Sequence, residues 1–298
     1  MVTFELFLQH LINGISLGSL YALIAIGYTM VYGIVRLINF AHGDIIMLAA
    51  YFVFFGVGLF HMPWWLSALL SIVLTALVGM GIEKAAYKPL RDAPRISILI
   101  SAIGVSFFLE NFGLVVFGGR PQAFYSPQVF QGVIKLGNVS IINLGIIIPV
   151  ITIGLLLGLV YIVNNTKTGM AMRACSKDID TAKLMGIDVD RIISFTFGLG
   201  SALAAVGGIM WGLKYPQLHP LIGIMPGLKC FIAAVVGGIG NIPGAMLGGF
   251  ILGLGEILLV AFLPELSGYR DAFAFIILIL ILLFRPTGIL GEKVAEKV

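Results

Sequence analysis

The chain contains the uninterrupted apolar stretch Gly145-Ile-Ile-Ile-Pro-Val-Ile-Thr-Ile-Gly-Leu-Leu-Leu-Gly-Leu-Val-Tyr-Ile-Val163 and, near its end, Ala272-Phe-Ala-Phe-Ile-Ile-Leu-Ile-Leu-Ile-Leu-Leu-Phe284. A strand of a membrane β-barrel would instead alternate apolar and polar residues over about ten positions. A helix satisfies its backbone hydrogen bonds internally, so continuous apolar runs of roughly 20 residues are typical of membrane-spanning helices. The two stretches therefore predict α-helices that lie in lipid.

The composition extends this conclusion to the whole chain. Of its 298 residues, 59% are hydrophobic and 11% are charged, and the mean hydropathy is +1.08. A soluble domain carries about 25% charged residues, so lipid must be the main solvent here. We predict an all-α polytopic membrane protein in which residues 1–298 form a single transmembrane domain.

Nine apolar runs follow one another along the chain. They lie near residues 14–35, 44–60, 64–83, 96–118, 145–163, 191–213, 226–241, 245–263 and 270–284. The run at 226–241 is short and rich in glycine, and a half-helix is one interpretation of it. We expect about nine transmembrane helices, with eight or ten as alternatives.

The distribution of positive charge predicts the orientation. Lysine and arginine concentrate in residues 84–95, 164–191 and 285–298, whereas residues 119–143 hold only two of them. Cytoplasmic loops carry an excess of these residues, so the three basic segments are expected in the cytoplasm. Nine crossings then place the N-terminus outside and the C-terminus in the cytoplasm.

Neither the cysteines nor the net charge indicates a different class of protein. Cys175 and Cys230 lie far apart without a metal-type spacing, so no disulfide and no metal site is predicted. The net charge is +4, but the basic residues flank membrane segments, and topology explains them better than nucleic-acid binding does. The first lysine or arginine is Arg36, so residues 1–34 are interpreted as a retained segment and not as a signal peptide.

A weak internal repeat relates the two halves of the chain. Leu17-Gly-Ser followed by Ala22 matches Leu199-Gly-Ser followed by Ala204. The repeats would cover about 10–118 and about 191–284. Their first helices would cross in opposite directions, which predicts an inverted-topology repeat, as in many alternating-access transporters. A chance match between abundant small residues is the alternative.

Two polar breaks interrupt the apolar runs at matching places in the halves. They read Arg36-Leu-Ile-Asn-Phe-Ala-His-Gly-Asp44 and His219-Pro-Leu-Ile-Gly-Ile-Met-Pro-Gly-Leu228. Paired interruptions of this kind point to a transport path. The polar and helix-breaking members are therefore candidate path residues: Asn39, His42, Asp44, His219 and Pro226. For the first break, a plain surface turn is the alternative to an unwound or re-entrant segment within the membrane.

Three further polar residues lie inside apolar runs. They are Glu110, Asn111 and Glu256. Burial of a carboxylate in a membrane is costly, so we expect these side chains to face the bundle interior and to find partners there. They are candidate path residues, with structural hydrogen bonds between helices as the alternative.

The segment 167–188 is expected to be an amphipathic helical stretch between two spanning runs. Gly186 suits a left-handed helix end. Small and apolar residues on this segment suggest that it docks on another protein, although a plain solvated connector is the alternative. The candidate coupling residues are Gly169, Ala171, Arg173, Ala174, Ala182 and Gly186.

Several segments resemble the high-affinity branched-chain amino acid permeases. They include Gly14–Gly33, Ile38-Asn-Phe-Ala-His-Gly-Asp44, Gly169-Met-Ala-Met-Arg-Ala174 through Gly186-Ile187, Val236-Gly-Gly-Ile-Gly-Asn-Ile-Pro-Gly-Ala245 and Arg285-Pro-Thr-Gly-Ile-Leu-Gly291. The resemblance covers essentially the whole chain and is closest to the smaller permease subunit of that ATP-driven (ABC) importer. In the family, the segment that matches 169–187 docks on the ATP-hydrolysing subunit.

The resemblance also implies partners. A second permease subunit (a paralogue or a copy of this chain), two ATP-binding subunits and an extracytoplasmic solute-binding protein are expected in a bacterial or archaeal cytoplasmic membrane. The substrates would be leucine, isoleucine and valine. ATP and magnesium would be bound by the partner, because no G-x-x-x-x-G-K-[ST] loop is present. No cofactor and no enzymatic activity are expected in this chain.

Two alternatives to this function stay open at the level of sequence. The first is an ABC permease for urea or other small neutral amino acids, which shares the family signatures. The second is a secondary transporter, which would need coupling-ion sites in this chain and no docking segment.

Overall fold

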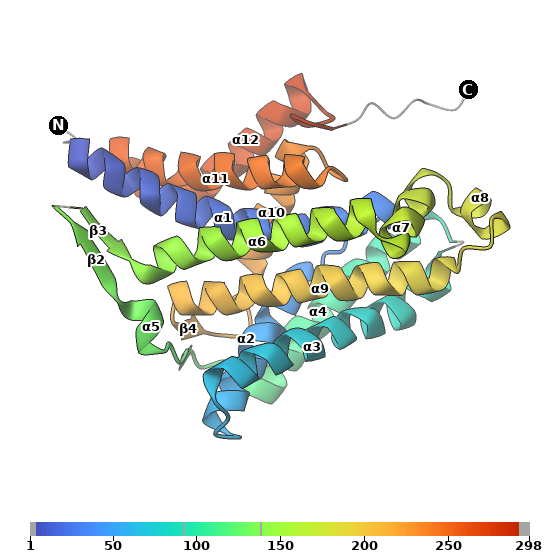
Figure 1. Cartoon of the computed structure of the whole chain (residues 1–298), viewed down its shortest axis with the longest axis horizontal. Coiled ribbons are helices and arrows are strands. Elements are labelled where there is room, and N and C mark those ends of the chain that lie inside the picture. Colours follow the sequence, from blue (N-terminus) through green and yellow to red (C-terminus); the bar gives the residue numbers. More distant parts are fainter. Residues whose placement is uncertain (1–3, 92, 138, 292–298) are drawn as a thin grey trace.

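The computed structural model describes residues 4–91, 93–137 and 139–291 (Figure 1). Its long apolar helices are α1 (Phe4–Val35), α3 (Trp64–Ile82), α4 (Arg95–Phe117), α6 (Asn143–Asn165), α9 (Val189–Lys214), α11 (Ile242–Phe262) and α12 (Arg270–Phe284). In the described part, seven helices are long and apolar enough to cross a membrane, if α3 is taken with the turns to Leu90 and α12 with its preceding turn from Pro264.

Two apolar helices are too short to cross. α2 (His42–Gly58) has 17 residues and α10 (Ile224–Gly237) has 14. At 1.5 Å per residue they extend about 25 and 21 Å, whereas the hydrocarbon core of a bilayer is about 30 Å thick. Of the about nine transmembrane helices predicted, nine apolar helices are present in the described residues and seven of them are long enough to cross. The short run predicted at 226–241 corresponds to α10.

The remaining elements are small. They are α5 (Gln128–Gln131), α7 (Lys167–Lys177), α8 (Ile179–Leu184), and the strands β1 (Gln122–Ala123), β2 (Val133–Leu136), β3 (Val139–Ile142) and β4 (Gln217–Leu218). β2 and β3 form an antiparallel hairpin, and β1 pairs with β4. These strands lie in connections outside the apolar helices, so the chain is all-helical where it meets lipid.

Helix α1 is the centre of the bundle. It packs against α6, α9, α10 and α11 and is buried over most of its length. Glycines allow this close packing: a Cβ atom at Gly18 would lie 2.9 Å from the Cα atom of Phe250. Helices α3, α4, α6 and α12 surround the core and expose large apolar side chains such as Leu77, Val115 and Leu157, as lipid-facing surfaces do.

The hairpin β2–β3 and the helices α7 and α8 lie at opposite ends of the bundle (Figure 1). Several contacts gather other segments at the α7 end. The Arg36 side chain donates to the backbone oxygen of Ser176, and Lys88 pairs with Asp190. The backbone nitrogen of Leu290 donates to the carbonyl oxygen of Gly237, and Gly240, just beyond, meets Gly33 near the end of α1 that leads to Arg36. The three basic segments, as far as they are described, are therefore at the same end, as one common side of the membrane requires.

Candidate functional site: two helix breaks and the pocket beside them

The two breaks approach each other in the middle of the bundle. The non-helical part of the first covers residues 36–41, and that of the second ends at Gly223. A Cβ atom at Gly43 would lie 2.6 Å from the carbonyl oxygen of Gly223, so the two backbones touch and only glycine fits. Both predicted breaks were too long at their C-terminal ends, because α2 begins at His42 and α10 at Ile224. Pro226 is tolerated in the first turn of α10, because the N–H groups of a first turn have no acceptor within the helix and the N–H that proline lacks is therefore not missed.

The breaks enter from opposite ends of the bundle. The first break starts at the α7 end, where Asn39 accepts a hydrogen bond from the Tyr87 hydroxyl. It then runs back into the bundle to His42, whose Nε2 lies 3.3 Å from the carbonyl oxygen of Ile24 in α1. The second returns from the opposite end, where Gln217 and Leu218 pair with β1. Helices α1 and α9, which precede the breaks, lie side by side and run in opposite directions (Figure 1). An inverted repeat would have this arrangement, and the repeat stays a prediction.

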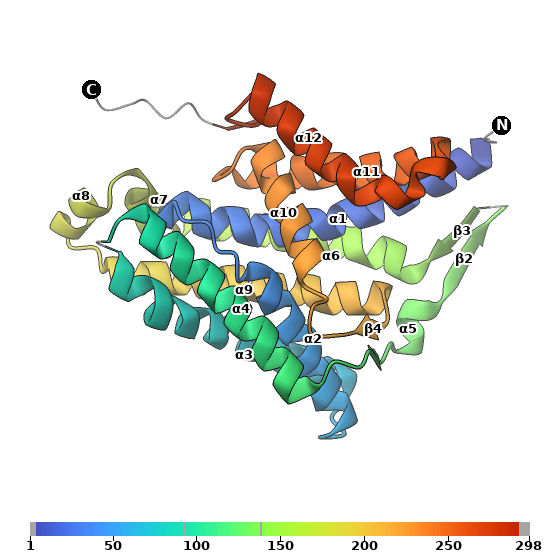
Figure 2. The ribbon, with the colours of Figure 1, turned by 180° about the vertical axis from the view of Figure 1, so that it is seen from behind.

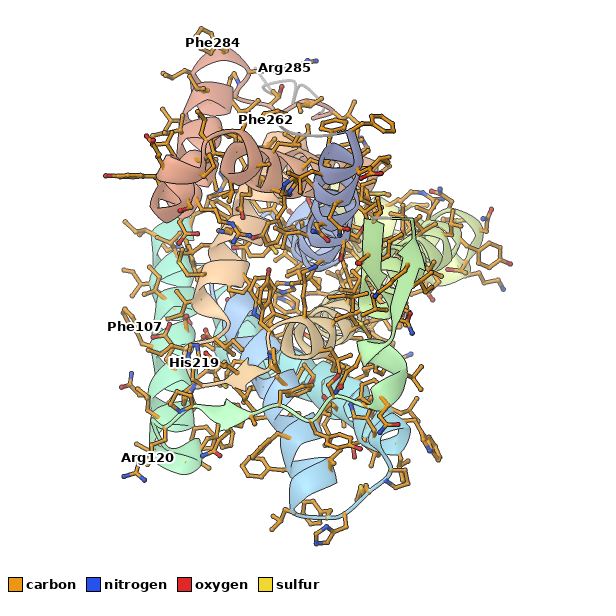
Figure 3. All side chains as sticks on the ribbon, turned by 90° about the vertical axis from the view of Figure 1, so that its left-hand side faces the viewer. Phe107, Arg120, His219, Phe262, Phe284 and Arg285 are labelled. Atoms are coloured by element: carbon orange, nitrogen blue, oxygen red, sulfur yellow. The ribbon has the colours of Figure 1, made fainter. Side chains whose placement is uncertain are left out.

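The contact between the two breaks, at Gly43 and Gly223, is called the crossing below. A pocket of about 200 Å³ lies beside this crossing. Figure 2 shows this side of the bundle, with α2, α4 and α10 toward the viewer. In Figure 3, Phe107 lies on the outer side of α4 and His219 at the break before α10. The lining residues are Tyr28, Phe40, Gly43, Asp44, Ile103, Ser106, Phe107, Glu110, Ile224, Gly227, Leu228 and Phe231.

The pocket brings together two of the predicted path residues. Asp44 is buried and accepts a hydrogen bond of 2.6 Å from the Ser106 hydroxyl, and Glu110 lies on the same wall one turn further along α4. Asn39 and His42 are buried next to the pocket but are occupied by partners within the bundle. The arrangement is a mostly apolar cavity with two carboxylates, near the middle of the bundle.

Glu256 belongs to a different charge cluster, in which its own side chain is fully buried. Its carboxylate lies 2.9 Å from Nζ of Lys229 and 3.2 Å from Nε of Arg270, and it accepts a hydrogen bond from the Tyr21 hydroxyl. Lys229 also pairs with Asp271 at 2.7 Å. These contacts join α1, α10, α11 and α12. The geometry of Glu256 therefore fits the alternative expectation, a structural link between helices, and not a place on the path.

Asn111 does not face the interior. Its side chain is exposed on α4, and its amide donates to the carbonyl oxygen of Phe107 in the same helix. The expectation that it faces the path was wrong, because a polar side chain can satisfy itself on its own helix and needs no interior partner. Sequence reasoning also missed Lys229, although a lone cation in an apolar run is the same signal that singled out Glu256.

Segment 167–188 is helical, as predicted, and forms the two short helices α7 and α8. Thr166 caps α7 by accepting from the backbone nitrogen of Gly169, and Asp178 caps α8 by accepting from Asp180 and Thr181. The helical part of the segment ends before Gly186, whose φ of +81° is the left-handed conformation that glycine favours.

The face of this segment that packs on the bundle is the one with small residues. Gly169 and Ala182 are buried, while Ala171 and Ala174 pack in part against the core beside α1 and α9. The expectation that these residues meet another protein therefore needs correction. Gly169 shows why a small residue is needed for this packing: a Cβ atom there would collide with the carbonyl oxygens of Ile162 and Val163 in α6.

The opposite face of α8 is free. Leu184 and Met185 are 87% and 78% exposed, although both are large and apolar. Arg173, a predicted coupling residue, donates to the carbonyl oxygen of Val163 and so holds α7 against the bundle.

The cysteines and acidic residues show no redox or metal site in the described ranges. Cys175 and Cys230 are both buried and free, and burial raises the pKa of the Cys175 thiol. No group of three or more His, Cys, Asp or Glu side chains in residues 4–91, 93–137 and 139–291 is placed to hold a metal ion.

Comparison with known proteins decides the family. A family described as "Branched-chain amino acid transport system / permease component" matches residues 10–282. The chain belongs to this family. The permease is 44% identical to the high-affinity branched-chain amino acid transport system permease protein LivH of Escherichia coli, over 99% of each chain. It is 44% identical to the corresponding protein BraD of Pseudomonas aeruginosa, over 98% of each chain, and 30% identical to a probable permease of Methanocaldococcus jannaschii.

This membership confirms several predictions. The permease is a multi-pass, all-helical membrane protein, and it is a translocation component with no catalytic role of its own. A permease component is one part of a transport system, so it acts together with other subunits.

Proposed function

We propose that this permease is the transmembrane subunit of an ATP-driven importer for leucine, isoleucine and valine. The full-length similarity to relatives that are named as branched-chain amino acid permeases supports the substrate class. Two ATPase subunits would bind ATP and magnesium, a secreted binding protein would deliver the substrate, and a second permease subunit would complete the path. The setting would be a bacterial or archaeal cytoplasmic membrane.

The translocation route would pass the crossing of the two breaks. α2 and α10 both begin at this crossing and are too short to span, and irregular backbone at membrane depth is tolerated only in protein or beside a water-filled cavity. The pocket lined by Asp44 and Glu110 lies next to it. Alternation between outward- and inward-facing states would open this region to either side in turn, provided that ATP binding favours one state.

The transport assay tests the substrate and the energy source together. The complete system in proteoliposomes should take up labelled leucine, isoleucine and valine only with internal ATP and the binding protein. Uptake of urea in place of these amino acids would support the other ABC permease. Uptake that is driven by an ion gradient without ATP would support a secondary transporter.

The orientation predicts a labelling pattern. Cysteines introduced singly at Lys177 in α7 and at Gln128 in α5 would both be exposed. If α7 is cytoplasmic, a membrane-impermeant thiol reagent should label position 128 but not position 177 in intact cells. The reverse pattern would overturn the orientation. The native cysteines are buried, so the unmodified permease is the background control.

The exposed face of α8 is the expected contact with the ATPase. An acidic residue at Leu184 would place a charge in an apolar contact, and a defect of this kind costs about 1–3 kcal/mol. Leu184→Asp should therefore leave the permease inserted but reduce co-purification of the ATPase about tenfold or more, since 1.4 kcal/mol is a factor of ten. Ala174→Glu is a poorer test because Ala174 packs in part on the bundle.

Val129→Asp is the matched control for this variant. Val129 is also an exposed apolar residue, but it lies in α5 near the opposite end of the bundle. Normal ATPase binding by Leu184→Asp, or an equal loss by Val129→Asp, would contradict docking through α8.

A further inference from the structure

The pocket beside the crossing has negative groups and no positive ones. Asp44 and Glu110 line it, and its lining includes no Lys, Arg or His. In residues 4–91, 93–137 and 139–291, no ion pair within 4.0 Å joins either carboxylate to a basic side chain. The Ser106 hydroxyl is the hydrogen-bond partner of Asp44. An unpaired carboxylate within a membrane is costly and marks a functional site.

A second polar group in the same pocket also lacks a partner. Tyr28 lines the pocket and is 4% exposed, and its buried hydroxyl has no hydrogen-bond partner in the described part of the chain. Buried hydroxyl groups in native proteins are nearly always hydrogen-bonded. The Tyr28 hydroxyl is therefore available to donate to, or accept from, a molecule that enters the pocket.

The rest of the lining is apolar and aromatic. Phe40 and Phe231 lie with their ring centroids 6.4 Å apart, and the Tyr28 ring lies 5.6 Å from that of Phe231. Ile103 and Leu228 add aliphatic surface. Small-molecule sites combine such an apolar lining with a few polar groups that fix orientation. The complementary ligand has one positive group and a short apolar body.

We propose that this pocket binds the α-ammonium group of the transported amino acid through Glu110 and Asp44, with the branched side chain against the aromatic wall. The inference rests on the proposed function and adds a recognition step within the permease itself. The Tyr28 hydroxyl donates to the substrate carboxylate. The permease then selects for the amine and does not leave all of the selection to the binding protein.

Protection of a cysteine in the pocket wall tests this proposal. The complete transporter with Ile103→Cys is purified without binding protein, and the rate of labelling by a small maleimide is measured. Leucine and 3-methylbutylamine, which keeps the ammonium group and the branched chain, should slow labelling. 4-Methylpentanoate, which lacks the amine, and sodium chloride should not. Protection by 4-methylpentanoate or sodium equal to that by leucine would overturn the proposal.

Variants assign the effect to the carboxylate. Glu110→Gln keeps the shape of the side chain but removes its charge, so the leucine concentration for half-protection should rise about tenfold or more, as expected for loss of a hydrogen bond between charged groups. Glu110→Asp should retain most of the protection. Glu265→Gln, at an exposed acid in the turn before α12, is the matched control and should change nothing. Unchanged protection in Glu110→Gln would refute the site.

The two proposals fail in different ways. If wild-type proteoliposomes do not import branched-chain amino acids but 3-methylbutylamine still protects Ile103→Cys, the amine site stands and the importer function is wrong. If wild-type import is ATP-dependent but no amine protects the pocket, the importer function stands and the amine site is wrong.

Discussion

Gly223→Val should strongly reduce transport. A Cβ atom at this position would collide with the carbonyl oxygen of Gly43, which is backbone and cannot rotate away. Overpacking against movable side chains costs about 1–3 kcal/mol, and a clash of the new side chain with a backbone carbonyl should exceed that range. We expect uptake per inserted molecule to fall at least about tenfold, which corresponds to 1.4 kcal/mol. Gly223→Ala should show a smaller loss in the same direction.

Gly104→Val is the control for Gly223→Val. Gly104 lies in α4, and a Cβ atom there meets no atom within 4 Å. Uptake and the amount of inserted protein should match the wild type, because valine adds only lipid-facing surface. If Gly223→Val also transported normally, the contact between the two breaks would not be needed for function.

Glu256→Leu should strongly destabilise the bundle. The substitution removes the carboxylate that pairs with Lys229 and Arg270, and it leaves Lys229 buried with one partner fewer. Loss of one member of a buried ion pair costs about 3–5 kcal/mol. The fraction of folded permease that remains after heating in detergent, measured by size-exclusion chromatography, should fall at a clearly lower temperature than for the wild type.

Two further variants show whether the effect comes from the buried charge. Asp271→Asn changes a half-exposed partner and leaves the pair of Lys229 with Glu256 intact, so its effect should be small. The double variant Lys229→Met/Glu256→Leu removes both buried charges and should recover part of the stability lost in Glu256→Leu. If the double variant were less stable than both Glu256→Leu and Lys229→Met alone, the cluster would not act through charge pairing.

The site was predictable only in part. Asp44 could be singled out because it lies in one of two matching breaks, and Glu110 because an ionisable residue in an apolar run needs an interior partner or a function. The same rule failed for Asn111, which bonds to its own helix, and it could not tell that Glu256 belongs to a different cluster. Ser106 and Tyr28 gave no sequence signal, because hydroxyl groups are common in membrane helices and a missing partner can be recognised only in three dimensions.

The coupling segment shows the same limit. Capping by Thr166 and Asp178 and the end at Gly186 are local features, and the two short helices follow from them. Which face of these helices is free depends on the neighbouring helices. Small residues were expected to meet a partner, but they are equally suited to packing within the bundle, where Gly169 and Ala182 lie.

The helical class, the positions of the nine apolar helices and the places where helices break were predictable from the sequence, because these depend on hydrophobicity, on backbone hydrogen bonding in lipid and on residues within one or two turns. Two other features could be recognised only in the folded bundle. The breaks return to a common depth and touch at Gly43 and Gly223, and Tyr21 and Glu256, 235 residues apart, are hydrogen-bonded. Such contacts join segments that are distant in the chain, and their partners are selected by the packing of the whole bundle.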